Sequence, residues 1–135
     1  HERREMYGTP TYSHEENLHL YTHLNNETEQ LLKDGKSVIY DTNFNYHKDR
    51  EMMRAIADRA KAQTVLVWIH IPEAIAISRA TDSKNQESTR VLGNMPLKTF
   101  QHIVGRLEKP ELSERAIVLD GTKIAKDYVA EQLGL

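Results

Sequence analysis

Apolar residues recur at helical spacing through the first half of the chain. Ser13 and Glu16 have the Ser-x-x-Glu form of a capping box, which is typical of a helix N-terminus. Behind them an apolar stripe continues to Gly35, a residue well placed to end the helix. A second helix is expected over residues 47–62. The inward positions are Leu20, Tyr21, Leu24, Leu31 and Leu32 in the first helix, and Met52, Met53, Ile56 and Ala60 in the second.

Three short apolar runs predict strands between the helical segments. Residues 37–40 form the first run, residues 64–70 the second and residues 115–119 the third. The second run is continuous and rich in β-branched residues, as in a strand that is covered on both faces. Pro72 and Pro96 are expected to open helices, and Thr122 to cap a last one. These three helices are predicted over residues 72–79, 96–107 and 122–133.

Strands that alternate with helices indicate an α/β fold, with a parallel sheet and right-handed crossovers. No repeat or linker divides the sequence, so residues 1–135 are predicted to form one domain. Ligands of such sheets bind at the carboxyl ends of the strands. The polar residues of segments 41–43, 70–72 and 120–121 fall at those ends. The sequence therefore predicts a site along this edge of the sheet.

The composition suits a globular protein and excludes several other classes. Of the 135 residues, 39% are hydrophobic and 28% charged, which does not fit disorder. No apolar run approaches the roughly 20 residues that span a bilayer. The absence of cysteine excludes a thiolate zinc site and is consistent with a cytoplasmic location. His19 and His23 could share a helix face, but no carboxylate pattern accompanies them, so a solvated face is favoured over a metal site.

Residues 36–43 end in Asp41-Thr42-Asn43, and Arg50 follows about two helical turns later. This order of motifs resembles P-loop kinases of the polynucleotide-kinase-like kind, a group placed among AAA-type ATPases. Residues 71–73 with Arg79 resemble the approach to the family's lid. Further matches lie at Phe100, Arg106, Leu107, Glu108 and Pro110, in the final strand over 117–121, and at Arg3 in an early helix.

The resemblance implies a three-layer P-loop NTPase fold, with helices on both faces of the sheet. The family's Gly-x-x-x-x-Gly-Lys-Ser/Thr loop does not occur in this sequence. Gly35-Lys36-Ser37 imitates its end, but these residues close a helix and enter a strand, whereas a phosphate cradle needs the reverse order. In the family the first strand lies between the strand that ends at Asp41 and the one that ends at His70. We therefore expect upstream residues or another chain to supply that strand and its loop.

The resemblance also implies roles for individual residues. Asp41 would act in catalysis and hold magnesium indirectly, through water. Arg79 would begin a lid over about residues 79–95 and grip phosphate oxygens, and Arg3 would act at the acceptor end. The expected acceptor or phosphate contacts are Thr42, Asn43, Arg50, Lys84 and Arg90, and the expected nucleotide contacts are Asp120, Gly121 and Thr122. Ordinary turn chemistry at Asp41, Thr42 and Asn43 and a helix cap at Thr122 remain open alternatives.

The function that follows is transfer of the γ-phosphoryl group of ATP, with Mg²⁺, to a hydroxyl acceptor. The acceptor is a polynucleotide 5′-hydroxyl or a small molecule, and the net charge of −2 gives no global basic field for nucleic acid. A second hypothesis is a non-catalytic nucleotide-binding or interaction module with a degenerate P-loop fold. A third is a toxin-like kinase, similar in fold to zeta toxins.

Overall fold

The protein is described by a computed structural model that covers residues 2–8, 11, 13–81 and 95–135. The chain forms two compact units. The first comprises residues 1–44 and 48–64 and is called here the helical unit. The second comprises residues 45–47 and 65–135 and is called the sheet unit.

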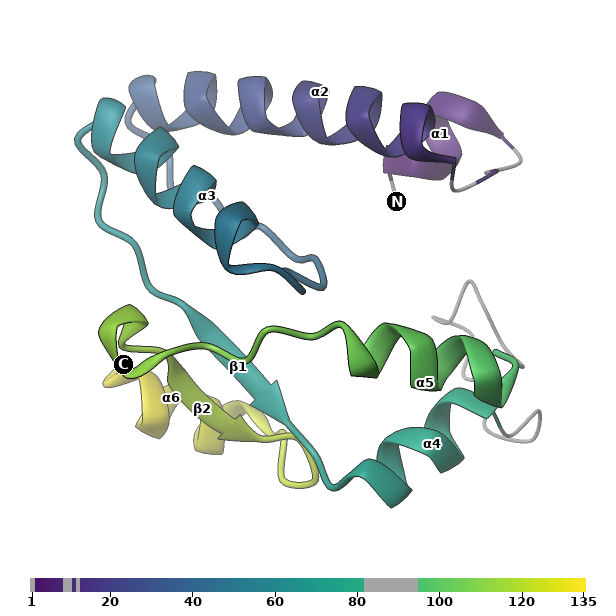
Figure 1. Cartoon of the computed structure of the whole chain (residues 1–135). Helices are drawn as coiled ribbons and strands as arrows, with labels where there is room; N and C mark the ends of the chain where they lie inside the picture. Colours follow the sequence, from purple (N-terminus) through teal and green to yellow (C-terminus); the bar gives the residue numbers. More distant parts are fainter. Residues whose placement is uncertain (1, 9–10, 12, 82–94) are drawn as a thin grey trace. The chain divides into compact units, whose positions relative to one another are not determined.

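The helical unit is built from α1 (Glu2–Tyr7), α2 (His14–Lys33) and most of α3 (His47–Arg59), as Figure 1 shows. The predicted capping box is confirmed in part: the Ser13 hydroxyl accepts a hydrogen bond from the Glu16 amide, at 3.1 Å. Gly35 ends α2 with a φ of 76°, a conformation that glycine adopts without a steric penalty. The buried apolar residues of the unit are Leu20, Ile56 and Ala57.

The helix predicted over 47–62 stops earlier, at Arg59. Lys61 takes a left-handed φ of 56°, and the Ala62 amide donates to the Ala57 carbonyl at 2.9 Å. This reversal satisfies carbonyls that a helix end would otherwise leave unbonded. The sequence therefore predicted the helix and its start correctly but placed its C-terminal end too far along the chain.

The strand predicted over 37–40 is wrong for the part of the chain that the structure describes. No strand is assigned there, and the Ile39 side chain is 96% exposed. A strand is stable only when a neighbour pairs with its backbone amides and carbonyls. The apolar pattern of these residues suits strand pairing, but neither described strand pairs with them.

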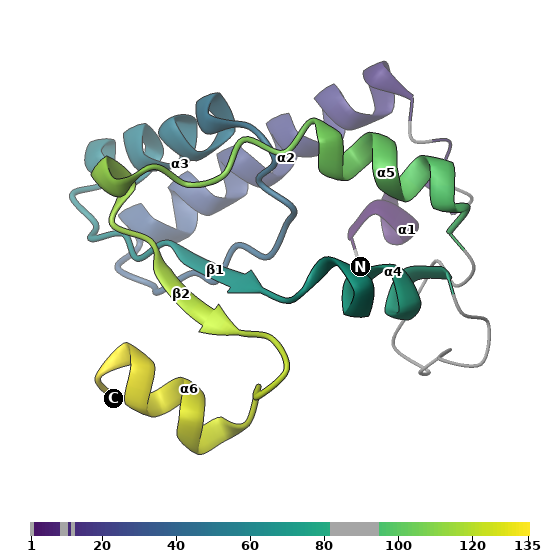
Figure 2. The same cartoon turned by 60° about the horizontal axis from the view of Figure 1, so that its bottom comes forward.

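The sheet unit contains two parallel strands, β1 (Val67–His70) and β2 (Ile117–Asp120). Figure 2 shows them side by side and running in the same direction. Their register pairs Val67 with Ile117 and His70 with Asp120. The strands predicted over 64–70 and 115–119 are thus confirmed as a parallel pair, although each is shorter at its start. The resemblance implies a three-layer fold with a central parallel sheet. Among the described residues, that sheet consists of these two strands.

The remaining helices of the sheet unit are α4 (Glu73–Thr81), α5 (Leu97–Gly105), the short 3₁₀ helix η2 (Leu112–Glu114) and α6 (Lys126–Leu133). Helix α4 packs on α5, and α6 packs on β2. Leu119 is the buried apolar residue of β2. The helices predicted to open after Pro72 and at Pro96 are confirmed, and the latter ends at Gly105, two residues before the expected end.

The last helix begins four residues later than predicted. Thr122 does not cap it, because Ala125 occupies the N-cap position of α6. Instead, the backbone amide and the hydroxyl of Thr122 both donate to the Asp120 carboxylate, at 2.9 and 2.6 Å. Such a turn, closed by an aspartate side chain, competes with helix formation for the same backbone donors.

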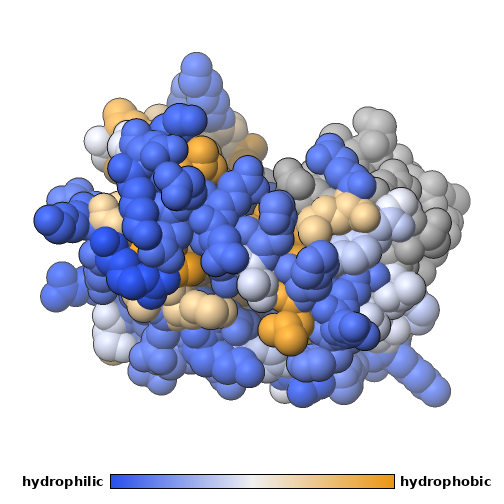
Figure 3. All heavy atoms as spheres, turned by 90° about the horizontal axis from the view of Figure 1, so that it is seen from above, coloured by the Kyte–Doolittle hydropathy of each residue, from blue (hydrophilic) through white to orange (hydrophobic). Residues whose placement is uncertain are grey.

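The surface in Figure 3 is mainly hydrophilic, and its apolar residues appear in small groups. Within the described part of the chain, no helix is long and apolar enough to cross a membrane.

Candidate functional site at the carboxyl edge of the strands

The two strands end at the same edge of the sheet unit, as parallel strands do. Their last residues, His70 and Asp120, are partners in the register. Just beyond them the Gly121 amide donates to the His70 carbonyl, at 2.8 Å. The loop after β2 is therefore held close to the point where the chain leaves β1.

Asp120 is fixed as an anion at this edge. Its Oδ1 accepts both Thr122 hydrogen bonds, and Lys123 Nζ lies 3.4 Å from its Oδ2. The Thr122 hydroxyl and amide, followed by Lys123, lower the pKa of the Asp120 carboxyl below its ordinary value. The Asp120 amide also donates to the Tyr128 hydroxyl, at 2.9 Å, which ties the strand end to α6. The carboxylate is thus charged and oriented at neutral pH.

Gly121 occupies a place that a larger residue would not fit. A Cβ atom there would lie 2.3 Å from Cγ2 of Ile71 and 2.9 Å from Cγ2 of Ile69. Those distances are well inside van der Waals contact, and Cγ2 of isoleucine is attached directly to a branched carbon that moves little. The close approach of the loop to β1 therefore depends on glycine at this position.

Arg79, the predicted lid arginine, reaches this loop from α4. Its Nη1 donates to the Gly121 carbonyl at 3.2 Å. The structure thus brings Arg79, Asp120, Gly121 and Thr122 together, four of the residues that the sequence singled out. A guanidinium beside a turn at the carboxyl ends of parallel strands is suited to bind a phosphate-bearing ligand.

The second group of predicted residues lies in the helical unit, on the segment after α2. Thr42 is held by a hydrogen bond of 3.1 Å between its hydroxyl and that of Tyr21. Tyr40 donates to the Asn25 side chain at 3.0 Å, and burial, with smaller effects of Tyr21 and Asp49, raises the pKa of Tyr40 to about 12. Two tyrosine contacts with α2 therefore hold the backbone on either side of Asp41.

Asp41 and Asn43 are exposed on this segment. Exposure leaves the Asp41 carboxylate accessible to a ligand or a hydrated metal ion. Asp41 belongs to the helical unit, whereas Arg79 and Asp120 belong to the sheet unit. A single site that contains all three residues therefore stays a prediction.

Arg50 is buried, with 4% of its surface exposed. Its Nη1 donates to the Phe44 carbonyl at 2.8 Å. Phe44 has a φ of 44°, in the left-handed region that is costly for a non-glycine residue, and its ring lies 5.5 Å from that of Tyr40. Arg50 therefore stabilises the turn that follows Asp41, Thr42 and Asn43. A direct contact between Arg50 and substrate stays a prediction.

Other predicted residues fall outside the described part of the chain. These are Lys84, Arg90 and the side chain of Arg3, together with lid residues 82–94.

Sequence reasoning missed Lys123 and gave His70 no role. Lys123 could have been noticed from its position three residues after Asp120, a spacing that brings the two charges together in a tight turn. The roles of Tyr21 and Tyr40 depend on contacts between α2 and a later segment, which no local pattern predicts.

The described residues contain no group of three or more histidine, cysteine or acidic side chains that could hold a metal ion. The expected Mg²⁺ site stays a prediction; proteins often bind Mg²⁺ through one or two carboxylates, while phosphate and water fill the other positions. A single exposed carboxylate such as Asp41 fits that mode of binding.

A family model for the AAA domain matches residues 1–110 of the chain. The chain therefore belongs to the AAA domain family, and its class is that of nucleotide-binding domains with the P-loop NTPase fold. The match includes Asp41, Arg50 and Arg79 and ends before β2, so the placement of Gly121 beside Arg79 comes from the structure. Comparisons with curated proteins and with solved structures gave no match.

Proposed function

We propose that the chain is part of an ATP-dependent kinase of the polynucleotide-kinase-like group, which transfers the γ-phosphoryl group of ATP to a hydroxyl acceptor. The observation that carries the proposal is the hydrogen bond from Arg79 to Gly121 at the carboxyl edge of a parallel strand pair. This bond holds an arginine beside the loop after β2, which the proposal assigns to nucleotide binding, in a chain that belongs to the AAA domain family.

Phosphoryl transfer depends on positioning and on stabilising negative charge, more than on covalent chemistry by the protein. In this proposal Arg79 leaves the Gly121 carbonyl and binds phosphate oxygens as a planar fork. The Asp120–Thr122 turn borders the adenine base. Bound Mg²⁺ would neutralise phosphate charge, and Asp41 would hold it through water. Asp41 would also orient the acceptor hydroxyl, with Thr42 and Asn43 beside it and Arg50 supporting their turn.

The phosphate cradle of this kinase would come from residues other than these 135, since the sequence has no Gly-x-x-x-x-Gly-Lys-Ser/Thr motif. The exposure of apolar residues in and just before β1 supports this assignment. Val65 and Ile69 are 69% and 59% exposed, although the run from 64 to 70 has the composition of a strand buried on both faces. A larger sheet, with a further strand paired to β1 and helices packed on its faces, would cover such residues.

The test uses the full-length gene product and ATP labelled in the γ-phosphoryl group. It is incubated with a 5′-hydroxyl oligonucleotide, nucleosides, sugars and aminoglycosides in turn. The proposal predicts transfer of label to one of these acceptors. Absence of both transfer and acceptor-stimulated ATP hydrolysis across the panel would contradict it.

Arg79→Lys and Arg115→Lys form a matched pair for the same assay. Both arginines are exposed and belong to the sheet unit, but Arg115 precedes β2, at the opposite end from Gly121. Lysine keeps the charge and loses the fork, so Arg79→Lys should lower kcat by at least about tenfold. Arg115→Lys should leave kcat unchanged. Equal effects of the two substitutions would remove Arg79 from the proposed role.

A non-catalytic nucleotide-binding or interaction module is the second candidate. The observation in its favour is the lack of the phosphate-loop motif in this sequence. It predicts that the full-length gene product either binds ATP without turning it over or does not bind ATP. A toxin-like kinase predicts instead a cognate antidote protein that suppresses phosphoryl transfer.

A further inference from the structure

Two polar side chains of α2 contact the segment that carries Asp41. The Tyr21 hydroxyl lies 3.1 Å from the Thr42 hydroxyl, and Oδ1 of Asn25 accepts a hydrogen bond of 3.0 Å from the Tyr40 hydroxyl. Tyr21 and Asn25 are four residues apart, so they share one face of the helix. All of these residues belong to the helical unit. One helix face therefore binds both the residue before Asp41 and the residue after it.

The exposure of this segment alternates from residue to residue. Tyr40 and Thr42 are partly buried, whereas Ile39, Asp41 and Asn43 are exposed. A period of two is that of an extended segment, in which neighbouring side chains point to opposite sides. The alternation indicates that the contacts at positions 40 and 42 keep the Asp41 carboxylate turned away from α2.

The chain is fixed again two residues further on. The Phe44 carbonyl accepts a hydrogen bond from the buried Arg50, and the Phe44 ring lies 5.5 Å from that of Tyr40. The segment is thus held at positions 40, 42 and 44, and Tyr21 makes the middle contact. Loss of that contact would give the backbone on both sides of Thr42 more conformational freedom, and the Asp41 carboxylate with it.

We propose that Tyr21 is a positioning residue of the kinase site, which acts through Thr42 to aim the Asp41 carboxylate at the acceptor hydroxyl. The inference rests on the proposed function, in which Asp41 orients that hydroxyl. As the acceptor oxygen forms its bond to the γ-phosphorus, its proton passes to Asp41, and the bond from that phosphorus to the bridging oxygen breaks and releases ADP. Tyr21 and Thr42 keep their protons. The rate of such a step depends steeply on the alignment of the reacting groups.

The experiment measures steady-state phosphoryl transfer by the full-length gene product, with each acceptor of the panel above that takes label. Tyr21→Phe keeps the ring and removes the hydroxyl, and it should lower kcat by about threefold to tenfold, the effect of one hydrogen bond. The KM for ATP and the unfolding midpoint should change little, because Tyr21 is 37% exposed and the proposed ATP contacts are other residues. If Tyr21 only stabilised the fold, the midpoint would fall and the kcat of the folded protein would not.

Two substitutions of Thr42 test the route of the effect. Thr42→Val removes the partner hydroxyl, so adding Tyr21→Phe to it should lower kcat no further. Thr42→Ser keeps the hydroxyl, so adding Tyr21→Phe to it should lower kcat as much as in the natural protein. Additive effects of Tyr21→Phe and Thr42→Val would overturn the inference.

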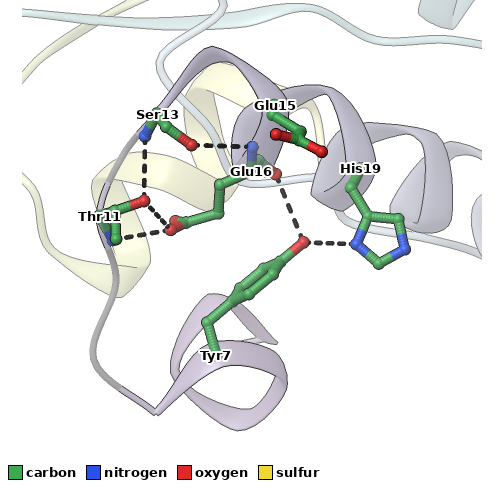
Figure 4. Close-up of a pocket in the computed structure, with 6 residues that line it drawn as sticks. All are labelled: Tyr7, Thr11, Ser13, Glu15, Glu16 and His19. Carbon is green, nitrogen blue, oxygen red and sulfur yellow. Dashed lines mark hydrogen bonds between the residues drawn. The ribbon is translucent and has the colours of Figure 1, made fainter.

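Tyr7→Phe is the matched control, since it removes a tyrosine hydroxyl from the same unit. Figure 4 shows that this hydroxyl points to His19, with 2.6 Å between the oxygen and Nδ1. Tyr7→Phe should leave kcat unchanged. An effect of Tyr21→Phe no larger than that of Tyr7→Phe, in a natural protein that transfers label, would overturn the inference and leave the kinase proposal standing. Absence of transfer by the natural protein would overturn both.

Discussion

At the residue scale, the candidate site depends on the close approach of Gly121 to β1. Gly121 was assigned to the nucleotide loop by resemblance, and no sequence pattern explained why another small residue would not serve there. The reason is tertiary: two isoleucine side chains, from positions 69 and 71, occupy the space that a Cβ atom would need. Such a constraint can be seen only when segments about 50 residues apart in the chain are brought together.

We predict that Gly121→Ala destabilises the sheet unit by about 1–3 kcal/mol, because the methyl group forces Ile69 and Ile71 to move. Denaturant unfolding followed by circular dichroism measures the loss. Gly105→Ala is the control, since nothing lies within 4 Å of a Cβ at Gly105 and alanine favours the helix there. Equal stability of the Gly121→Ala variant and the natural protein would contradict the described packing.

The Asp120 carboxylate gives a second prediction at this scale. Thr122→Val should raise the pKa of Asp120 toward its ordinary value, because it removes the strongest hydrogen bond and leaves the Thr122 backbone amide in place. Folding lowers this pKa, so ionised Asp120 stabilises the fold above its ordinary pKa, and the contribution is lost as the pH falls through the folded value. The carboxyl carbon resonance of Asp120, followed by NMR over a pH titration, measures the change. An unchanged titration would show that the Thr122 hydroxyl does not bind the carboxylate.

At the scale of elements, the helices were predicted better than the strands. Helical spacing, the Ser13 cap and the prolines at 72 and 96 are local signals, and they predicted α2, α3, α4 and α5 with small errors at the ends. The run over 37–40 has a strand-like composition but forms no strand in the described residues, because a strand requires a partner from elsewhere in the sequence. The start of α6 was misjudged because Thr122 suits both a helix cap and a turn with Asp120.

Helices α2 and α3 are linked by a charged contact that no sequence pattern indicated. Glu29 of α2 binds Arg59 of α3 at 2.6 Å and Lys33, one turn along α2, at 2.8 Å. Hydrogen bonds from Arg59, and next from Lys33, lower the pKa of Glu29 to about 2. The contact therefore stabilises the helix pair above the ordinary pKa of glutamate and is lost as the pH falls toward about 2.

We predict that Arg59→Met raises the pKa of Glu29 more than Lys33→Met does, because the Arg59 hydrogen bond is the largest single cause of the shift. A carboxyl-detected NMR titration of both variants measures the order. The effect on stability should be small, since exposed ion pairs are worth little and are screened by salt. A larger shift in Lys33→Met would indicate that the contact between α2 and α3 is weaker than described.

At the scale of the whole molecule, the family could be predicted from the sequence, and the acceptor could not. The order of Asp41-Thr42-Asn43, Arg50 and Arg79 indicated a P-loop kinase type, and the AAA domain match over residues 1–110 confirms the coarser class. The identity of an acceptor depends on the shape and charge of a complete pocket. The predicted contacts Lys84 and Arg90 lie outside the described residues, so that pocket is not defined by local patterns or by the two units taken singly.

Asp41 gives the functional prediction at this scale. In the full-length gene product, Asp41→Asn should lower kcat for phosphoryl transfer by about tenfold to a thousandfold, because the amide neither holds Mg²⁺ well nor accepts a proton. Its unfolding midpoint should stay near that of the natural protein, since Asp41 is exposed. Asp58→Asn, at another exposed aspartate in the same unit, is the control and should change neither quantity. Normal turnover of Asp41→Asn would remove Asp41 from the mechanism.

The central claim is that the carboxyl edge of β1 and β2 is the nucleotide face of this domain. It is tested most directly by NMR, with MgATP titrated into the isotope-labelled full-length gene product. The account predicts that the largest saturable shifts occur at the amides of Gly121 and Thr122 and at the side chain of Arg79, as its hydrogen bond to Gly121 is exchanged for one to phosphate. ATP binding that leaves these three signals unmoved, or a complete absence of binding, would contradict it.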